Sequence, residues 1–584
     1  MKNLYSKIPL AQSLVELCRS KGIVDVVITP GSRNAPLTIS FANHADFKAY
    51  SIVDERSAAF FALGMAQRTQ KPVALCCTSG SALLNYYPAV AEAFYSDIPL
   101  VVISADRPVE RLDIGDGQTI RQKNVYANHI LYSANLYSEI VLNQHTQDQK
   151  LLQKKWEAQR HNEREINLAL NIAIERKGPV HINVPFYEPL YETVEEPETQ
   201  PLKIAPIQET KGIEQKTLEP YAKLWNTSKK KLILVGVNEP HSIASAYVEW
   251  LAKDPSVLVF SETTSNLHHQ NFILRIDNII APIEISKDPA AQFKALQPDI
   301  LLTFGGMVVS KKVKAFLRQY QPKHHWHVDE KKAFDTYFCL NKHFDVSPNT
   351  FFQRFMPLTH AQKSDYQKTW LANRKRRNAR HEVYMQHIPF SDLKVFNILL
   401  NHLKEKQVLQ VSNSSVVRYV NLFKLSPDLE VYCNRGTSGI DGCVATAVGA
   451  ALKSDIPTTL ICGDLSFLYD SNGLWNAYIP DGFRIVVINN GGGGIFRILP
   501  GRKTEPYFHK FFETRHHLTA EHVAKMHGFA YQQARTQEEL TAHLADFFTK
   551  KGPRILEVFT PIEVNDQILL DYFKFINGVE RQEK

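Results

Sequence analysis

The chain has 584 residues, enough for three or four domains at roughly 150 residues each, which excludes a peptide hormone or a disulfide-stabilised miniprotein. Its composition is 44% hydrophobic and 22% charged, a profile typical of folded proteins rather than of disordered ones. Lysine and arginine total 68 against 60 acidic residues, so the net charge is +8. This mild excess does not by itself predict nucleic-acid binding.

The seven cysteines are odd in number, contain no C-x-x-C pair and mostly lie in apolar runs. Such cysteines are typical of reduced thiols in a reducing compartment. No run approaches the ~20 apolar residues of a membrane span, and the first residues lack the apolar core of a secretory signal. We therefore expect a cytoplasmic protein that does not insert into membranes.

Short β-branched runs alternate with helical stretches along the chain, which predicts parallel sheets built from β-α-β units. The first series ends at a Glu- and Pro-rich stretch, 193–206, that resembles a linker. A second series starts near residue 230 and fades into a charged segment at 362–384, and a third starts at 407. We predict three consecutive open, mostly parallel α/β domains, at residues 1–192, 207–365 and 390–584.

Two polar motifs follow neighbouring strands of the third predicted domain. Asp464 comes directly after one strand, and Asn490 follows the next strand 26 residues later. Ligands collect beyond the carboxyl ends of parallel strands, and the two side-chain oxygens with the Gly492 carbonyl suit Mg²⁺. Taken alone, Gly-Asp and Asn-Asn-Gly are also typical strand-ending turns. The spacing, the strands and the glycines together favour the metal site.

This pair of motifs is similar to the diphosphate- and metal-binding motif of thiamine diphosphate enzymes, with Leu465 where most members carry a second glycine. The resemblance implies that Asp464, Asn490 and the Gly492 carbonyl hold Mg²⁺. Backbone N–H groups near Ser466 and in the turn at 413–415 can face the diphosphate. The cofactor contacts implied in this part of the chain are Asn413, Ser414, Asp464, Leu465, Ser466, Asn490, Gly492 and Ile495.

A glutamate that activates the cofactor is then expected in the first domain. Glu55 stands where a predicted strand runs into a helix of small residues. A carboxyl buried against the aminopyrimidine, with its pKa raised by desolvation, can move the proton that makes the cofactor reactive. The alternative is that Glu55 is a favourable acidic residue in the first turn of a helix. The motif in the third domain favours the catalytic role.

Further motifs in the first and third domains indicate which family of thiamine diphosphate enzymes the chain resembles. They lie at residues 29–37, 104–108, 117–122, 413–418 and 434–442. Together they closely resemble the menaquinone-pathway family of 2-succinyl-5-enolpyruvyl-6-hydroxy-3-cyclohexene-1-carboxylate synthases, nearly end to end in these two domains and weakly in the middle one. The resemblance implies thiamine diphosphate and Mg²⁺ as cofactors, and 2-oxoglutarate and isochorismate as substrates.

The substrate contacts implied by this family are rich in arginine, whose planar guanidinium group suits the two carboxylates that each substrate carries. They are Ser32, Arg33, Arg107, Gln118, Lys311, Ser414, Arg418 and Arg435, and Ile440 matches the bulky apolar residue under the cofactor. Lys312 stands where arginine is expected, and Gly117 where asparagine is expected. A surface ion pair is the commoner role of a single arginine, but four that follow strands favour one pocket for di-acids.

The expected reaction is the decarboxylation of 2-oxoglutarate and 1,4-addition of the resulting succinyl carbanion to isochorismate. Simple thiamine-dependent decarboxylases resemble one another in a His-His pair that protonates the carbanion, and the loop at 111–122 has no histidine. We interpret the histidine pairs at 268–269, 324–325 and 516–517 as surface or structural residues. In similar enzymes the glutamate and the diphosphate site come from different chains, so we expect a homodimer or homotetramer.

Two alternatives remain open from the sequence. The first is another thiamine diphosphate carboligase, of the acetohydroxyacid synthase type, which would consume pyruvate; the arginines count against it. The second is a nucleotide- or nucleic-acid-binding protein, suggested by the basic run at 373–377 and the glycines at 491–494. Such a charge run is more often a solvated helix face, and no Gly-Lys-Ser/Thr follows the glycines, which excludes a P-loop. We expect no nucleic-acid partner.

Overall fold

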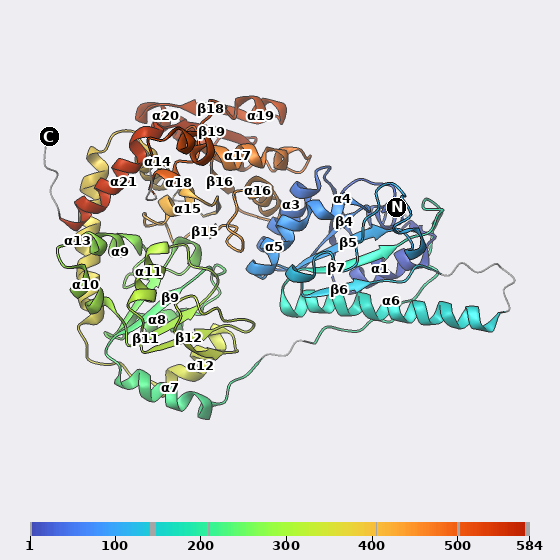
Figure 1. Cartoon of the computed structure of the whole chain (residues 1–584), viewed down its shortest axis with the longest axis horizontal. Coiled ribbons are helices and arrows are strands. Elements are labelled where there is room, and N and C mark those ends of the chain that lie inside the picture. The colour runs from blue at the N-terminus through green and yellow to red at the C-terminus, as the bar shows by residue number, and fades with distance from the viewer. Residues whose placement is uncertain (1–2, 140–147, 208–210, 404–405, 499–502, 579–584) are drawn as a thin grey trace. The chain divides into compact units, whose positions relative to one another are not determined.

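The computed structural model describes residues 3–139, 148–207, 211–403, 406–498 and 503–578. These residues form three large sheets, one within each predicted domain (Figure 1). A small antiparallel pair joins β1 (Tyr5–Ser6) to β8 (Thr193–Val194), so the stretch predicted to be a linker begins with a short strand. The prediction of consecutive, mostly parallel α/β domains is confirmed.

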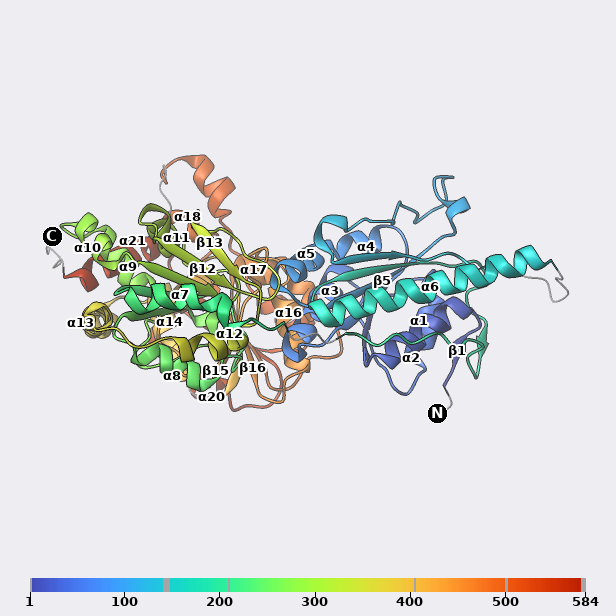
Figure 2. The same ribbon diagram turned by 90° about the horizontal axis from the view of Figure 1, so that it is seen from below.

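The N-terminal sheet has six strands, all paired in parallel. In spatial order they are β3 (Lys48–Ser51), β2 (Asp25–Ile28), β4 (Val73–Cys77), β5 (Leu100–Asp106), β7 (Val180–Pro185) and β6 (Tyr132–Asn135). Every residue of β5 is buried because helices cover both faces. One face carries α1 (Pro9–Ser20), α2 (Ala35–Ala42) and the long α6 (Gln149–Arg176), and Figure 2 shows α1 and α6 side by side. The other face carries α3 (Glu55–Thr69), α4 (Ser81–Asn85) and α5 (Tyr87–Ser96).

The middle sheet has five parallel strands. They are β10 (Val257–Ser261), β9 (Lys231–Val235), β11 (Ile300–Phe304), β12 (His324–Val328) and β13 (Leu340–Phe344). A core rich in aromatic residues joins one face to α7 (Gln215–Thr227), α8 (Ser245–Lys253) and α12 (Pro348–Phe355). A second core joins the other face to α9 (Asp277–Glu284), α10 (Pro289–Leu296), α11 (Lys311–Gln319) and the start of α13 (Tyr366–His387).

The C-terminal sheet has six strands, and its pairs β14–β15, β17–β19 and β18–β19 are parallel. In spatial order they are β15 (Leu429–Tyr432), β14 (Gln407–Val411), β16 (Thr458–Gly463), β17 (Phe483–Asn489), β19 (Arg554–Phe559) and β18 (Ala530–Ala534). The core on one face is completed by α14 (Asp392–His402), α15 (Ser415–Val420), α20 (Gln537–Phe547) and α21 (Ile562–Asn577). The remaining helices of this part are α16 (Cys443–Leu452), α17 (Asp464–Tyr469), α18 (Ile495–Ile498) and α19 (Glu521–Met526).

By compactness the chain divides into two units. The first unit contains the N-terminal sheet and its helices, together with residues 436–458 and 466–483. The second contains the middle and C-terminal sheets. The sequence did not indicate that α16 would pack with the first unit, because its pattern is only that of a buried helix. The boundaries proposed from the sequence stay predictions.

Helices α3 and α16 cross closely within the first unit because glycines face backbone at the crossing. A Cβ on Gly64 would lie 2.0 Å from the carbonyl oxygen of Thr446, and one on Gly449 would lie 2.0 Å from that of Phe61. No side chain fits between these backbones. The crossing therefore holds the middle of α3, the helix that begins at Glu55, against α16.

We expect Gly64→Ala to destabilise the first unit by about 2 kcal/mol, because overpacking against a backbone carbonyl outweighs the better helix propensity of alanine. Thermal unfolding followed by circular dichroism measures the effect. Gly482→Ala is the matched control in the same unit, since its Cβ would meet no atom within 4 Å. Equal midpoints for the two variants would contradict this account of the crossing.

Candidate functional site

Residues singled out in the first unit lie beyond the carboxyl ends of parallel strands of one sheet. Ser32 and Arg33 follow β2, Glu55 follows β3, and Arg107 follows β5. Ser32 is exposed, whereas Arg33 is buried and donates to the Phe186 carbonyl oxygen at 3.2 Å and to the Glu188 carboxylate at 3.1 Å. Parallel pairing therefore brings these side chains to one edge of the sheet.

Arg107 and Gln118 are in direct contact. Nη1 of Arg107 donates to the Gln118 carbonyl oxygen and to Ser79 Oγ, both at 2.8 Å. Burial raises the pKa of Asp106, and the charges of Arg107 and Arg33 oppose that rise, so both guanidinium groups lie within electrostatic reach of one carboxyl. A Cβ on Gly117 would meet no atom within 4 Å, so the asparagine expected there would fit.

Glu55 is the first residue of α3 and is half-buried. Asp54 caps the helix by accepting a hydrogen bond from the Ser57 N–H at 3.0 Å, and Asn85 Nδ2 lies 3.4 Å from Glu55 Oε2. The residues on either side of Glu55 bind the segment after α17. Asn472 donates to Asp54 at 2.8 Å, and Arg56 donates to the Tyr469 carbonyl at 2.7 Å. The backbone that carries the Glu55 carboxyl is therefore held from both sides.

The first unit also contains two of the predicted cofactor contacts. The Ser466 hydroxyl donates to the Ile440 carbonyl oxygen at 2.8 Å, and Ile440 is half-buried. The bond ties the first turn of α17 to the loop before α16. Contact of either residue with a cofactor stays a prediction.

In the second unit, the three predicted metal ligands lie together. Asp464 is buried, and its Oδ2 accepts the Gly492 N–H at 2.9 Å while its Oδ1 accepts the Leu465 N–H at 2.7 Å. Gly492 has a φ of +149°, and a Cβ there would lie 2.5 Å from the Glu513 carbonyl oxygen. Only glycine suits this position. The Gly492 carbonyl accepts the Gly494 N–H at 3.0 Å, and α18 begins next, at Ile495.

The side chain of Asn490 has a fixed orientation. Its Nδ2 donates to Asp392 Oδ2 at 3.0 Å, whereas its Oδ1 is buried without a hydrogen-bond partner. Burial raises the pKa of Asp392 to about 6, and the nearby Asp464 adds to the rise. A buried amide oxygen without a donor, next to a carboxylate and a backbone carbonyl, suits a hard divalent cation. These residues fit Mg²⁺. Asp392 was missed from the sequence because Ser-Asp at 391–392 reads as an ordinary helix cap.

His516 is also part of this site, contrary to our interpretation of the pair at 516–517. Its Nε2 lies 3.2 Å from Asp464 Oδ2, and its Nδ1 accepts the Leu518 N–H at 3.1 Å. The nearby carboxylate of Asp464 raises the pKa of His516. The sequence carried no signal for this contact, because His516 lies 52 residues after Asp464 and outside any strand.

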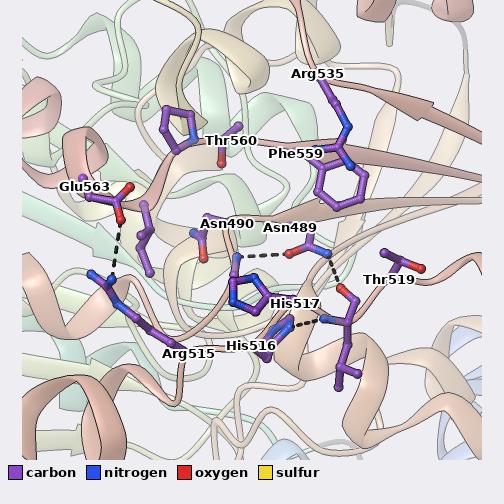
Figure 3. A pocket seen from close by; sticks show the side chains of 14 residues that line it. Asn489, Asn490, Arg515, His516, His517, Thr519, Arg535, Phe559, Thr560 and Glu563 are labelled. Carbon is purple, nitrogen blue, oxygen red and sulfur yellow. Dashed lines mark hydrogen bonds and ion pairs between the residues drawn. The ribbon is translucent and has the colours of Figure 1, made fainter.

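A pocket of about 600 Å³ opens beside Asn490 at the ends of β17 and β19 (Figure 3). His516, His517 and Thr560 contribute to its lining, and Arg515 and Arg535 lie on opposite sides of it. Arg515 pairs with Glu513 at 2.9 Å, whereas Arg535 lies over the Phe559 ring at 3.9 Å. The pocket adjoins the predicted metal ligands and belongs to the same edge of the sheet.

Four other predicted residues gather after β14 and β15. Arg435 Nη1 donates to Asn413 Oδ1 at 2.6 Å, and Arg418 donates to the Ser414 carbonyl oxygen. Ser414 has a φ of +68°, so a non-glycine residue is held in a rare conformation at this turn. Burial lowers the pKa of Arg418, and the charge of Arg435 lowers it further. The structure therefore brings the two arginines together.

The predicted Lys311 begins α11 beside this cluster and is exposed. Lys312 forms a close ion pair with Glu284, and Lys314, one turn into the helix, was not predicted. Burial lowers the pKa of Lys314, Glu262 opposes that change, and Arg435 and Lys311 add to it. Glu262 is buried, accepts the N–H groups of Val309 and Ser310, and has its pKa raised by burial to about 7.

The basic run at 373–377 lies within α13, where Lys375 and Arg376 are exposed, as on a solvated helix face, but Arg374 and Arg377 are not. Arg374 donates to the carbonyl oxygens of Gln270 and Phe272 at 2.7 and 2.6 Å. Arg377 is 1% exposed and donates to the Asn278 carbonyl at 3.2 Å. These two guanidinium groups therefore bind backbone carbonyl oxygens rather than facing solvent. In the part of the chain that is described, no helix combines the length and apolarity needed to cross a bilayer.

Three family models match the chain in order. Residues 8–128 match the thiamine pyrophosphate enzyme N-terminal TPP binding domain, 278–411 match the middle domain of thiamine pyrophosphate enzymes, and 414–558 match the C-terminal TPP binding domain. The curated 2-succinyl-5-enolpyruvyl-6-hydroxy-3-cyclohexene-1-carboxylate synthase of Christiangramia forsetii is 59% identical over 98% of this chain and 100% of its own length. This chain belongs to that synthase family.

Other members of the synthase family are also similar to this chain over nearly its full length. The Flavobacterium johnsoniae synthase is 54% identical over 98% of this chain and 99% of its own, and the Porphyromonas gingivalis synthase is 36% identical over 99% of each. The crystal structure of benzoylformate decarboxylase from Polynucleobacter necessarius matches with a TM-score of 0.65 and 16% identity, over 95% of this chain and 99% of that one. At this identity the match concerns the fold alone.

We expect Asp392→Ala to raise the Mg²⁺ concentration needed for half-maximal thiamine diphosphate binding by roughly 10-fold, because the Asn490 amide loses the group that orients it. Quenching of tryptophan fluorescence, titrated with Mg²⁺ at fixed cofactor, measures the change without turnover. Asp392→Asn is the matched control, since it keeps an oxygen that accepts from Asn490. If alanine and asparagine behave alike, Asp392 does not orient Asn490.

Proposed function

We propose that this chain decarboxylates 2-oxoglutarate and adds the resulting succinyl carbanion in 1,4 fashion to isochorismate, giving 2-succinyl-5-enolpyruvyl-6-hydroxy-3-cyclohexene-1-carboxylate and CO₂ in menaquinone biosynthesis. Membership of the synthase family over nearly the whole chain carries the proposal. The arginines at the carboxyl ends of both sets of strands support it, because each substrate is a di-acid and guanidinium groups capture carboxylates in two-point contacts.

Mg²⁺ would be held by Asp464 Oδ2, Asn490 Oδ1 and the Gly492 carbonyl. The unpartnered Asn490 oxygen supports this assignment, and His516 would have to release Asp464 for the cation to bind. When bound, thiamine diphosphate supplies a nucleophilic carbon and accepts the electron pair that CO₂ leaves behind. Glu55 would exchange a proton with the aminopyrimidine through its carboxyl oxygens.

The arginines orient the substrates and stabilise the negative charge that develops in the addition. Arg33 and Arg107 would do so at the edge of the N-terminal sheet, and Arg418 and Arg435 at the edge of the C-terminal sheet. Because their guanidinium groups are already bound by carbonyl and amide oxygens, little reorganisation is needed when a substrate arrives. The loop at 111–122 offers no imidazole to protonate a carbanion, which favours carbon–carbon bond formation over aldehyde release.

We also propose assembly as a homodimer or homotetramer, by resemblance to enzymes in which the glutamate and the diphosphate site come from different chains. A cytoplasmic location is proposed with it. None of the seven cysteines, which all lie within the described residues, forms a disulfide, and six of them are buried, which suits a reducing compartment.

We expect purified protein to consume isochorismate only when 2-oxoglutarate, thiamine diphosphate and Mg²⁺ are all present. Glu55→Gln should lower kcat at least about 100-fold, because the amide cannot exchange the proton. Isochorismate absorbance, with mass spectrometry of the product, measures both effects. Glu521→Gln is the matched control, because the side chain of Glu521 is 41% exposed and pairs with Lys525. Decarboxylation of pyruvate without consumption of isochorismate would instead indicate a different carboligase.

A further inference from the structure

Gln118 has an unusual backbone conformation. Its φ is +53°, in the left-handed region that residues with a side chain avoid unless their surroundings hold them there. It lies in the loop between β5 and β6 that also carries Gly117. A Cβ on Gly80, at the end of β4, would lie 3.0 Å from the Gln118 carbonyl carbon, so the two backbones are in close contact.

The side chain of Ser79 links the two predicted substrate contacts. Its hydroxyl accepts from Arg107 Nη1 at 2.8 Å and donates to the Gln118 carbonyl oxygen at 2.9 Å. The same Nη1 donates directly to that carbonyl at 2.8 Å, which closes a ring of three hydrogen bonds. Ser79 is 2% exposed, so water does not readily replace its hydroxyl. The ring connects the end of β4, the end of β5 and the loop.

A second set of hydrogen bonds, made by the fully buried Gln122, holds the same loop. Its Oε1 accepts the Gly80 N–H at 3.0 Å. Its Nε2 donates to the Ala105 carbonyl at 3.1 Å and to Asn183 Oδ1 at 2.8 Å. Gln122 thus fixes the base of the loop, and Ser79 holds its tip.

Arg107 has a competing partner at the surface. Its Nε lies 3.9 Å from Asp116 Oδ2, and the Asp116 side chain is 41% exposed. Without the Ser79 hydroxyl, one acceptor of the guanidinium group is lost and the Gln118 carbonyl loses one of its two donors. The guanidinium group can then turn toward Asp116.

We propose that Ser79 is a positioning residue for substrate binding. Its hydroxyl holds Arg107 and the left-handed backbone of Gln118 in one arrangement, and both then meet a substrate carboxylate in a fixed geometry. The inference rests on the proposed function, since that function makes Arg107 and Gln118 substrate contacts. Ser79 itself touches no substrate in this role.

The kinetic test compares Ser79→Ala with Ser81→Ala, in which the same change is made at an exposed position two residues further on. In Ser79→Ala we expect the KM of one of the two di-acids to rise about 10-fold, equivalent to about 1.4 kcal/mol. The KM of the other and kcat should change less than about threefold. Ser79→Cys, with a weak donor and acceptor of similar size, should fall between. A loss confined to kcat, with both KM values unchanged, would indicate a structural role only and overturn the proposal.

Amide hydrogen exchange of residues 113–122 supplies a readout that does not need turnover. We expect exchange in this loop to be at least about fivefold faster in Ser79→Ala than in wild type or Ser81→Ala. If the wild type forms no product but the loop loosens as expected, the proposed function fails, and only the part of the inference that concerns the fold stands, namely that the Ser79 hydroxyl holds Arg107 and the Gln118 backbone together. Unchanged exchange in Ser79→Ala would overturn the proposal whatever the activity.

Discussion

Parallel pairing of buried strands is the constraint on which the candidate site depends. In a parallel sheet all carboxyl ends meet at one edge, so loops that are distant in the sequence present their side chains together. Arg33, which lies 73 residues before Asp106 in the sequence, acts on the Asp106 carboxyl for this reason. In the C-terminal sheet the same constraint brings Asp464 to hydrogen-bond distance of the Gly492 N–H.

Polar side chains among the predicted site residues are already held by partners within the protein. Asp392 takes the amide nitrogen of Asn490 and leaves the amide oxygen without a partner. Arg33, Arg107 and Arg418 each donate to backbone carbonyl oxygens, which hold the guanidinium planes before any ligand is present. Such preorganisation lowers the cost of ordering side chains when a charged ligand binds.

Several residues contribute through backbone geometry rather than through charge. The φ of Gly492 is +149°, and a Cβ on this residue would collide with the Glu513 carbonyl oxygen. Ser414 and Gln118 adopt left-handed backbone conformations without being glycine, and side-chain hydrogen bonds hold the loops at both turns. Gly64 and Gly449 let α3 and α16 cross with their backbones in contact. These positions show where the fold places strain and close packing near the site.

The sequence by itself determined the three α/β domains and the positions of Asp464, Asn490, Glu55 and the four arginines, because strands and the residues directly after them are local patterns. The tertiary structure alone decided which partners those residues meet. His516 reaches Asp464, Asp392 orients Asn490, and Ser79 joins Arg107 to Gln118. The basic run in the sequence is typical of a solvated helix face, but Arg374 and Arg377 donate hydrogen bonds to backbone carbonyl oxygens once α13 packs. Contacts between residues tens of positions apart depend on how elements pack, and no local pattern encodes that.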